Sequence, residues 1–410
     1  MEKVANSIET KKPSAYAQVC RKIVFALLDK MTTASLRVHE PDEAGDGITT
    51  LGNPNAELSA QLNIHDPNVF IRFVKGGSIG AAEGFIDGEW SSPNLTHLIQ
   101  VFARSQSVLD DLESKMTWLT SLKNKLFHRK NNNSISGSKN NILAHYDLGN
   151  ELYTRFLDPE MMYSSAIYSD GIEDLDTAQL NKLKTICERL ELKATDKLVE
   201  IGTGWGGLAI FAAKNYGCHV TTTTISDAQH EYAKARIESL GLQDKITLLK
   251  QDYRKLTGQF DKLVSIEMIE AVGHEYFATF FAKCNDLVKP GGKLLIQAIT
   301  IADQRYEYYK NNVDFIQRYI FPGGCLPSIE IMSKHISKQT KMVIEGIHDI
   351  GLDYATTLEH WRERFNHNWH EIKEHGYDDK FKRLWLYYLC YCEGAFLERA
   401  TSAVHMIARK

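Results

Sequence analysis

The chain has 410 residues, a formal net charge of −4 and seven cysteines, none of them in a Cys-x-x-Cys pair. The length exceeds one ordinary compact core, so we expect two domains. The small negative charge gives no reason to expect nucleic acid as a partner. The odd cysteine count argues against a disulfide framework or a metal site and favours a reducing compartment. No apolar run approaches the roughly 20 residues that span a bilayer, and no signal-peptide pattern opens the chain, so we expect a soluble, cytoplasmic protein.

The N-terminal region has a mixed pattern, which predicts a smaller α+β domain. Residues 15–31 are typical of an amphipathic helix, with Val19, Ile23, Leu27 and Leu28 on its apolar side. Residues 58–74 alternate enough to suggest short strands, and residues 95–127 are typical of helix.

The clearest boundary is a polar stretch rich in Asn, Ser and Gly at residues 128–141. This composition is typical of a linker. We therefore expect an N-terminal domain over residues 1–127 and a second domain over residues 142–410.

After the boundary the sequence alternates between strand and helix patterns, which predicts an α/β fold with a mostly parallel sheet. The expected strands are Lys197–Ile201, His219–Ile225, Ile246–Lys250, Lys262–Ile266 and Lys293–Ile299. The expected helices are Leu208–Asn215, Asp227–Leu240 and Glu275–Leu287. Ligands of such sheets bind at the carboxyl ends of the strands, so the residues that follow each strand are the candidate site.

A glycine-rich turn follows the first of these strands, with Gly202, Gly204 and Gly206 at alternate positions. Glycines let the backbone turn tightly and approach a ligand closely. The spacing is not the dinucleotide fingerprint, and no Gly-Lys-Ser/Thr follows to hold phosphates. Acidic Glu200 just before the turn suits the ammonium group of S-adenosylmethionine (SAM), although the turn alone is a weak signal.

Polar residues also follow the other strands. Asp252 could accept from an adenine amine and Tyr253 could stack on the ring, or the pair could form an ordinary surface turn. Thr224 and Gln229 could hydrogen-bond the cofactor. Glu267 and Glu270 stand in an otherwise apolar segment and need partners, because an unpaired buried charge is costly. By position we assign a catalytic role to Glu270; the alternative is a capping or salt-bridged glutamate.

Taken together, these segments resemble the cyclopropane-fatty-acyl-phospholipid synthase family over nearly the whole chain. The resemblance rests on Gly80–Trp90, His145–Asn150, Gly202–Gly206, Gln251–Arg254, Glu270–Gly273, Tyr319–Ser328, Gly351–Leu358 and Cys392–Phe396. It implies a Rossmann-like SAM-dependent methyltransferase domain preceded by a lipid-engaging domain. It also implies that the alkene of an unsaturated phospholipid chain attacks the SAM methyl group, and that the resulting cation loses a proton to close a cyclopropane ring.

The resemblance further implies roles for individual residues. Bound bicarbonate is the expected base, and its site corresponds to Ser165, Glu270, Gln297, Ile299 and Tyr354. The cofactor positions correspond to Tyr163, Ser164, Gly202, Thr203, Gly204, Thr224, Gln229, Tyr253 and Arg254, with Asp252 added from its position. Ser165 and Gln297 stand where the best-known bacterial pattern has Cys and His; Gln keeps a donor but cannot become cationic.

The same resemblance predicts contact with the inner membrane surface and a homodimer. Lys123, Lys125, Arg129 and Lys130, interleaved with apolar residues, form a segment suited to anionic headgroups, or else a solvated helix end. Two other functions remain open. A hydride shift in the cation would give a methyl- or methylene-branched chain, and a non-catalytic lipid-binding protein could use the same scaffold.

Overall fold

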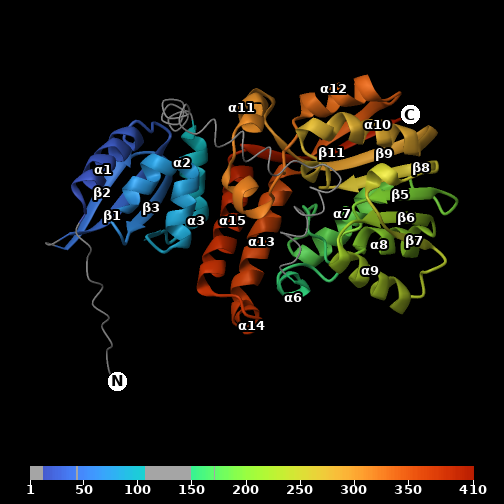
Figure 1. The fold of residues 1–410 in the computed structure, drawn as a ribbon, viewed down its shortest axis with the longest axis horizontal. Helices are drawn as coiled ribbons and strands as arrows, with labels where there is room; N and C mark the ends of the chain where they lie inside the picture. The colour runs from blue at the N-terminus through green and yellow to red at the C-terminus, as the bar shows by residue number, and fades with distance from the viewer. Residues whose placement is uncertain (1–12, 43–44, 107–148, 170) are drawn as a thin grey trace. The chain divides into compact units, whose positions relative to one another are not determined.

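The computed structural model describes residues 13–42, 45–106, 149–169 and 171–410. The chain forms two compact units (Figure 1). One takes in Met1–Ser121 and Tyr377–Glu398, and the other takes in Leu122–Gly376 and Arg399–Lys410. The expected linker and the basic segment that includes Lys123 and Arg129 lie outside the described residues.

The first unit is built around a four-stranded sheet of order β2-β1-β3-β4. Strands β1 and β3 are parallel, and the other pairs are antiparallel. Its elements are α1 (Ala15–Leu28), β1 (Ala34–Asp42), β2 (Gly45–Gly52), β3 (Leu58–Ile64), α2 (Val69–Ile86), β4 (Trp90–Ser91), α3 (Leu95–Arg104) and α15 (Asp379–Leu397). The expected strands over residues 58–74 are therefore only half correct, because α2 begins at Val69.

Helix α15 comes from the far end of the sequence yet packs on α2 and α3. A Cβ atom on Gly394 would lie 2.8 Å from Ile99 Cγ2, so only glycine allows this close approach. Glu393 Oε2 accepts from Thr96 Oγ1 at 3.0 Å. These contacts explain why Tyr377–Glu398 belongs to the first unit, whereas the sequence predicted one domain over residues 142–410.

Helix α1 buries a different face from the one that the sequence predicted. Its buried stripe consists of Ala17, Cys20, Val24 and Leu28. Val19 and Ile23 are 54% and 43% exposed. Their apolar side chains thus remain at the surface of the described part of this unit.

The second unit holds a seven-stranded sheet of order β10-β11-β9-β8-β5-β6-β7. Its strands are β5 (Lys197–Ile201), β6 (His219–Thr224), β7 (Ile246–Lys250), β8 (Phe260–Ile266), β9 (Val288–Ile301), β10 (Val343–Asp349) and β11 (Thr401–Arg409). Only β11 runs antiparallel to both of its neighbours, β9 and β10. The five expected strands and the Rossmann-like fold are confirmed, whereas β10 and β11 were not predicted.

Helices cover both faces of this sheet, as Figure 1 shows. The described helices of this unit are α6 (Asn150–Tyr153), α7 (Leu175–Arg189), α8 (Gly207–Tyr216), α9 (Asp227–Ser239), α10 (Phe277–Leu287), α11 (Tyr306–Asn311), α12 (Ile329–Gln339), α13 (Gly351–His367) and α14 (Trp369–Glu374). Helices α10 and α12 form one core with the sheet, and α7 and α8 form the other. The strand order reverses between β5 and β8, so the loops after these two strands flank the crevice where such sheets bind ligands.

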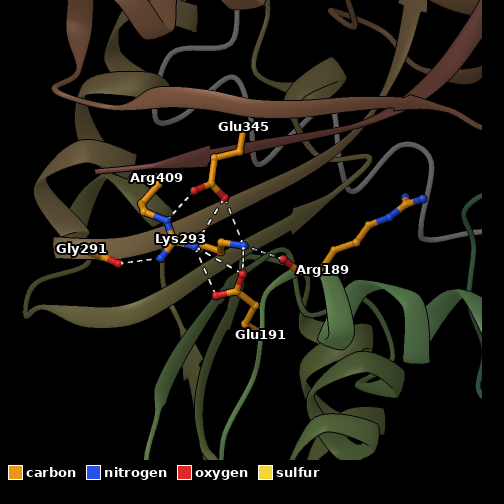
Figure 2. Close-up of polar contacts among 6 residues, drawn as sticks. All are labelled: Arg189, Glu191, Gly291, Lys293, Glu345 and Arg409. Atoms are coloured by element: carbon orange, nitrogen blue, oxygen red, sulfur yellow. Dashed lines mark hydrogen bonds and ion pairs between the residues drawn. The ribbon is translucent and has the colours of Figure 1, made fainter.

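An ion-pair network lies at the start of β9 (Figure 2). Lys293 Nζ lies 2.6 Å from Glu191 Oε1 and 3.1 Å from Glu345 Oε2. Arg409 Nη2 lies 3.2 Å from Glu191 Oε2. Lys293 also donates to the backbone oxygen of Arg189 at 3.3 Å, while the Arg189 side chain points away from the network.

No helix among the described residues is long and apolar enough to cross a bilayer.

Candidate active site

The glycine turn after β5 leaves its backbone open to a ligand. The N–H groups of Gly202 and Thr203 both donate to Thr223 O at 3.1 Å, which fixes the start of the turn on β6. Gly204 has φ +53°, and a Cβ atom placed there would meet nothing within 4 Å. A ligand can therefore approach the peptide backbone closely at Gly204.

Glu200, the acidic residue before this turn, is buried. Its Oε2 accepts from Thr222 Oγ1 at 2.6 Å, and Thr222 Oγ1 also lies 2.7 Å from Thr203 Oγ1. Burial raises the pKa of Glu200 to about 8, against the effects of the Thr222 hydrogen bond and of Lys182. The network therefore joins the acid to the glycine turn through two threonine hydroxyls.

Two further loops at this edge are held by their own side chains. Thr224 Oγ1 donates to Gln229 Oε1 at 2.9 Å. Asp252 accepts three hydrogen bonds from Arg254, from its N, Nε and Nη2 atoms at 2.9, 2.9 and 2.6 Å. The Tyr253 ring packs edge-on against a phenylalanine of α10, and its buried hydroxyl has no hydrogen-bond partner among the described residues.

The segment before α7 contributes Tyr163 and Ser164. The Tyr163 ring lies 5.2 Å from the ring of Trp361. Ser164 Oγ accepts from Lys182 Nζ at 2.8 Å, and Lys182 is fully buried. Burial lowers the pKa of Lys182 to about 8, and the Glu267 charge is the largest opposing effect.

Glu267, directly after β8, is the centre of the polar contacts at this edge. Its Oε1 accepts from Ser165 N at 2.9 Å and from Gln297 Nε2 at 2.7 Å. Its Oε2 accepts from Tyr354 Oη at 2.6 Å. The residue has φ +46°, a backbone conformation that is uncommon outside glycine. Burial raises its pKa, while the hydrogen bond from Tyr354 is the strongest effect in the other direction.

Glu270 stands one turn further along, in a 3-10 turn over Ile269–Ala271. Its Oε1 accepts from Ile299 N at 2.6 Å. Its Oε2 is buried and has no hydrogen-bond partner among the described residues. Burial, and next the nearby charge of Glu267, raise the pKa of Glu270 to about 8.

The amide of Gln297 has a fixed orientation. Arg189 Nη1 lies 2.6 Å from His405 Nδ1, and His405 Nε2 lies 2.8 Å from Gln297 Oε1. Because arginine only donates, His405 Nδ1 must accept and His405 Nε2 must carry the proton. Gln297 Oε1 therefore accepts, and its Nε2 group faces Glu267.

The loop containing Tyr319–Ser328 is tied to the same centre, since Cys325 N donates to Glu270 O at 2.8 Å. Of the His145–Asn150 motif, only Gly149 and Asn150 are described. Asn150 Oδ1 accepts from Trp205 Nε1 at 2.8 Å, which joins it to the glycine turn.

The structure thus brings together all five residues that were predicted to be catalytic: Glu270 forms a carboxylate pair with Glu267, and the other four contact this pair. Ser165, Gln297 and Tyr354 bind Glu267, and Ile299 binds Glu270. Sequence reasoning missed the central place of Glu267, although it had noted two carboxylates in an apolar segment. It also missed Lys182 and His405. Lys182 is one of several polar residues of α7, and His405 lies between apolar residues of β11, so no motif marks either of them.

Comparisons with known proteins show the family to which the chain is similar. A sequence profile of the mycolic acid cyclopropane synthetase family matches residues 133–406. The cyclopropane-fatty-acyl-phospholipid synthase of Escherichia coli (strain K12) is 38% identical over 357 residues, which cover 84% of this chain and 86% of that protein. The tuberculostearic acid methyltransferase UfaA1 of Mycobacterium tuberculosis is 36% identical over 361 residues, 86% of this chain and 83% of that protein.

A solved structure of a mycolic acid cyclopropane synthase is also similar to this chain. The structure of mycolic acid cyclopropane synthase CmaA1 complexed with SAH and CTAB aligns with a TM-score of 0.62 at 25% identity. The alignment covers 66% of this chain and 98% of that one.

Proposed function

The chain belongs to the mycolic acid cyclopropane synthetase family of SAM-dependent lipid methyltransferases, and we propose that it adds a methylene group to the double bond of an unsaturated phospholipid chain. The product is a cyclopropane fatty acyl chain. The observation that carries this proposal is the buried carboxylate pair Glu267–Glu270 beside the open glycine turn, because the reaction needs both a methyl donor and a base.

The residues at the strand ends fit SAM. The open backbone at Gly204 would admit the methionine part, and Glu200, joined to the turn through Thr222 and Thr203, would offer its carboxyl group toward the ammonium group. The remaining contacts are proposed for Tyr163, Ser164, Gly202, Thr203, Thr224, Gln229, Asp252, Tyr253 and Arg254. The cofactor supplies an electrophilic methyl group on a sulfonium.

The residues present do not fit bicarbonate as a bound base. Three of the groups that the family resemblance assigns to that ion, on Ser165, Gln297 and Tyr354, already donate to Glu267. A second anion would compete for the same donors and would lie against a like charge, which is costly at a buried site. No step of the proposed reaction therefore passes through bicarbonate.

The residues of the chain itself would position the alkene, exclude water, stabilise the cation and remove a proton. An alkene is a weak nucleophile, so a fixed approach to the methyl group matters greatly. The ring centroid of Tyr163 lies 5.3 Å from that of Tyr153 and 5.2 Å from that of Trp361. These three rings offer π faces to a developing cation. The carboxylate pair offers negative charge to that cation and a base for the proton that must leave.

Substrate access requires contact with a membrane. Tyr16, Val19 and Ile23 on α1 are 51%, 54% and 43% exposed and follow one another at helical spacing. An exposed apolar stripe of this kind suits the interface of a bilayer. We propose that the protein binds the inner membrane surface peripherally, and that it forms a homodimer, as the family resemblance implies.

One alternative product has specific support. UfaA1, a tuberculostearic acid methyltransferase by name, is nearly as similar to this chain as the cyclopropane synthase is. A branched chain arises when a hydride shift moves the cation and loss of a proton then leaves an alkene with a methyl or methylene branch instead of a ring. Gln297, which cannot become cationic, is the residue in this site that bears on the choice.

The test is direct. The protein and SAM are incubated with vesicles of an unsaturated phospholipid, and the acyl chains are examined by mass spectrometry and proton NMR. We expect a gain of one CH2, loss of olefinic signals and new cyclopropyl signals. A methyl doublet would support the branched alternative, and absence of SAM turnover would overturn both. Vesicles of saturated phospholipid provide the control.

A further inference from the structure

We propose that Glu267 is the base of this reaction, a carboxylate of the chain itself that stands where a bound anion would otherwise be held. The inference rests on the proposed function and deepens it. It assigns a catalytic role to a residue to which the sequence analysis gave none, and it removes the need for an external oxyanion.

The first support is the set of donors that meet at Glu267. A backbone N–H, a side-chain amide and a phenol hydroxyl donate to its two oxygens at 2.9, 2.7 and 2.6 Å. A carboxylate is a planar oxyanion that uses both of its oxygens as acceptors. Three donors that could hold a planar oxyanion therefore already bind the Glu267 carboxylate.

The second support is the backbone. Glu267 adopts φ +46° although it is not glycine, and its N–H donates to Gln297 O at 2.8 Å. Such conformations cost energy and persist only where the surrounding structure enforces them, often at functional sites. Here the same partner strand holds both the main chain and the carboxylate of Glu267.

The third support is the chain of contacts behind Gln297. Arg189 fixes the tautomer of His405, and His405 fixes the orientation of the amide, so that a donor and not a carbonyl faces Glu267. These groups come from α7, β11 and β9. Gln297 and His405 are positioning residues, because they act on the base and not on the substrate.

The chemical step balances with these parts. The π electrons of the alkene form a bond to the SAM methyl carbon, the carbon–sulfur bond breaks, and the sulfur leaves as a neutral thioether. Glu267 takes a proton from the newly added methyl group, and the electron pair of that C–H bond closes the ring onto the cation. Glu267 is then a neutral acid and loses its proton to solvent before the next turnover.

The electrostatic surroundings suit this role. Burial raises the pKa of Glu267 above its usual range, which strengthens it as a base. The three donors and the charge of Lys182 oppose that effect and keep an ionised form accessible. At a general base this balance brings the pKa nearer the working pH.

The experiment compares bicarbonate dependence in four forms of the 410-residue chain. Wild type, Glu267→Gln and Glu267→Gly are assayed on unsaturated phospholipid vesicles in buffer freed of carbon dioxide, without and with added bicarbonate. Glu188→Gln, an exposed glutamate of α7, is the matched control. SAM binding to each variant is measured by calorimetry and thermal unfolding is recorded, so that a folding defect is recognised.

We expect wild type and the control to turn over equally with and without bicarbonate. Glu267→Gln should lose about 100-fold or more in turnover, as expected for removal of a general base, with SAM affinity nearly unchanged and no rescue by bicarbonate. Glu267→Gly frees the three donors and accepts the positive φ without strain. Its turnover should be low without bicarbonate and should rise when the ion is added.

Two results would overturn the assignment while leaving the proposed function intact. One is a wild-type enzyme that modifies the lipid only when bicarbonate is present. The other is a Glu267→Gln variant that turns over as fast as the control. If wild type consumes no SAM under either condition, the proposed function itself has failed.

Discussion

Two groups of carboxylates lie along the same β-sheet and have opposite electrostatic character. At the start of β9, Glu191 and Glu345 face Lys293 and Arg409 (Figure 2). Hydrogen bonds from Lys293 and then Arg409 lower the pKa of Glu191 to about 2. At the other end of these strands, burial raises the pKa values of Glu267 and Glu270, and hydrogen bonds from neutral groups only partly oppose it.

The difference separates a structural use of glutamate from a chemical one. Carboxylates paired with cations at an exposed edge stay ionised and hold strands together, with small energetic consequences. Carboxylates buried without such pairing retain basicity, which is what a catalytic base requires. The ion pairs and the proposed catalytic carboxylates therefore lie at opposite ends of the strands, and substitutions in the two groups should have different effects.

After Glu267→Gln, the largest effect is expected for Glu270→Gln. Its Oε2 is buried without a partner among the described residues, and a cation that forms beside it would lower the pKa of Glu270 and favour the charged form. Glutamine keeps an oxygen for Ile299 N but cannot carry the negative charge. Loss of one such electrostatic group typically costs about 100-fold in turnover, so kcat should fall by that order while SAM affinity changes little. An equal loss of kcat and of SAM affinity would mean that Glu270 binds the cofactor or stabilises the fold.

The same variant has a second readout in stability. Glu270 has a pKa of about 8 in the fold and 4.5 as a free side chain, so the folded state holds the extra proton between these values. Stability should therefore fall as pH rises from about 4.5 to about 8. In Glu270→Gln this part of the decline should vanish when thermal unfolding is measured across that pH range. If the stability of the variant falls with pH as steeply as that of wild type, the pKa of Glu270 is not raised.

A smaller effect is expected for Tyr354→Phe. Its hydroxyl donates to Glu267 and is the strongest of the hydrogen bonds that lower the pKa of that residue. Without it the pKa of Glu267 should rise further, so the acidic limb of the pH–rate profile should move to higher pH. Turnover at neutral pH should fall by about 10-fold, within the range of one charge-assisted hydrogen bond. An unmoved limb would mean that another group carries the proton.

Much of the second unit could be predicted from the sequence. Apolar runs such as Leu198–Ile201 have few alternatives to a buried strand, and the glycine turn after them identifies the ligand edge. Strand β11 was missed because Thr401–Arg409 carries no turn signal and finds its place only by pairing with β9. The assignment of α15 to the first unit likewise depends on a tertiary contact at Gly394 that no local pattern contains.

The site shows the same limit at the level of single residues. The resemblance grouped Ser165, Gln297 and Tyr354 in one site, and the structure places all three against Glu267, a partner that the sequence analysis did not give them. A carboxylate can be matched to three donors only when the distances between them are known. The departure from the bacterial pattern at Gln297 gains a physical account, because its side-chain amide donates to Glu267. Ser165 donates to Glu267 only through its backbone N–H, so the contact does not explain the serine side chain.

Arg189 joins the two groups of carboxylates and offers a finer test. Its backbone oxygen accepts from Lys293, and its guanidinium fixes the tautomer of His405. In Arg189→Met, His405 is free to change tautomer, and the Gln297 amide can then turn its oxygen toward Glu267. Turnover should fall about 3- to 10-fold, the range of one net hydrogen bond. Selective ¹⁵N labelling of histidine should show protonated Nε2 in wild type and mixed tautomers in the variant.

Glu191→Gln should have the smallest effect, because it removes one carboxylate from the exposed network and leaves Glu345 to pair with Lys293 and Arg409. The Glu191 side chain is 54% exposed, so solvent screening keeps the expected loss within about 1 kcal/mol of unfolding free energy. Because its pKa is lowered in the fold, the loss should be present near neutral pH and should disappear as pH falls from about 4.5 toward about 2. Turnover on phospholipid vesicles should match wild type; a clear drop would mean that the ion pairs at the start of β9 act on the catalytic end of the sheet.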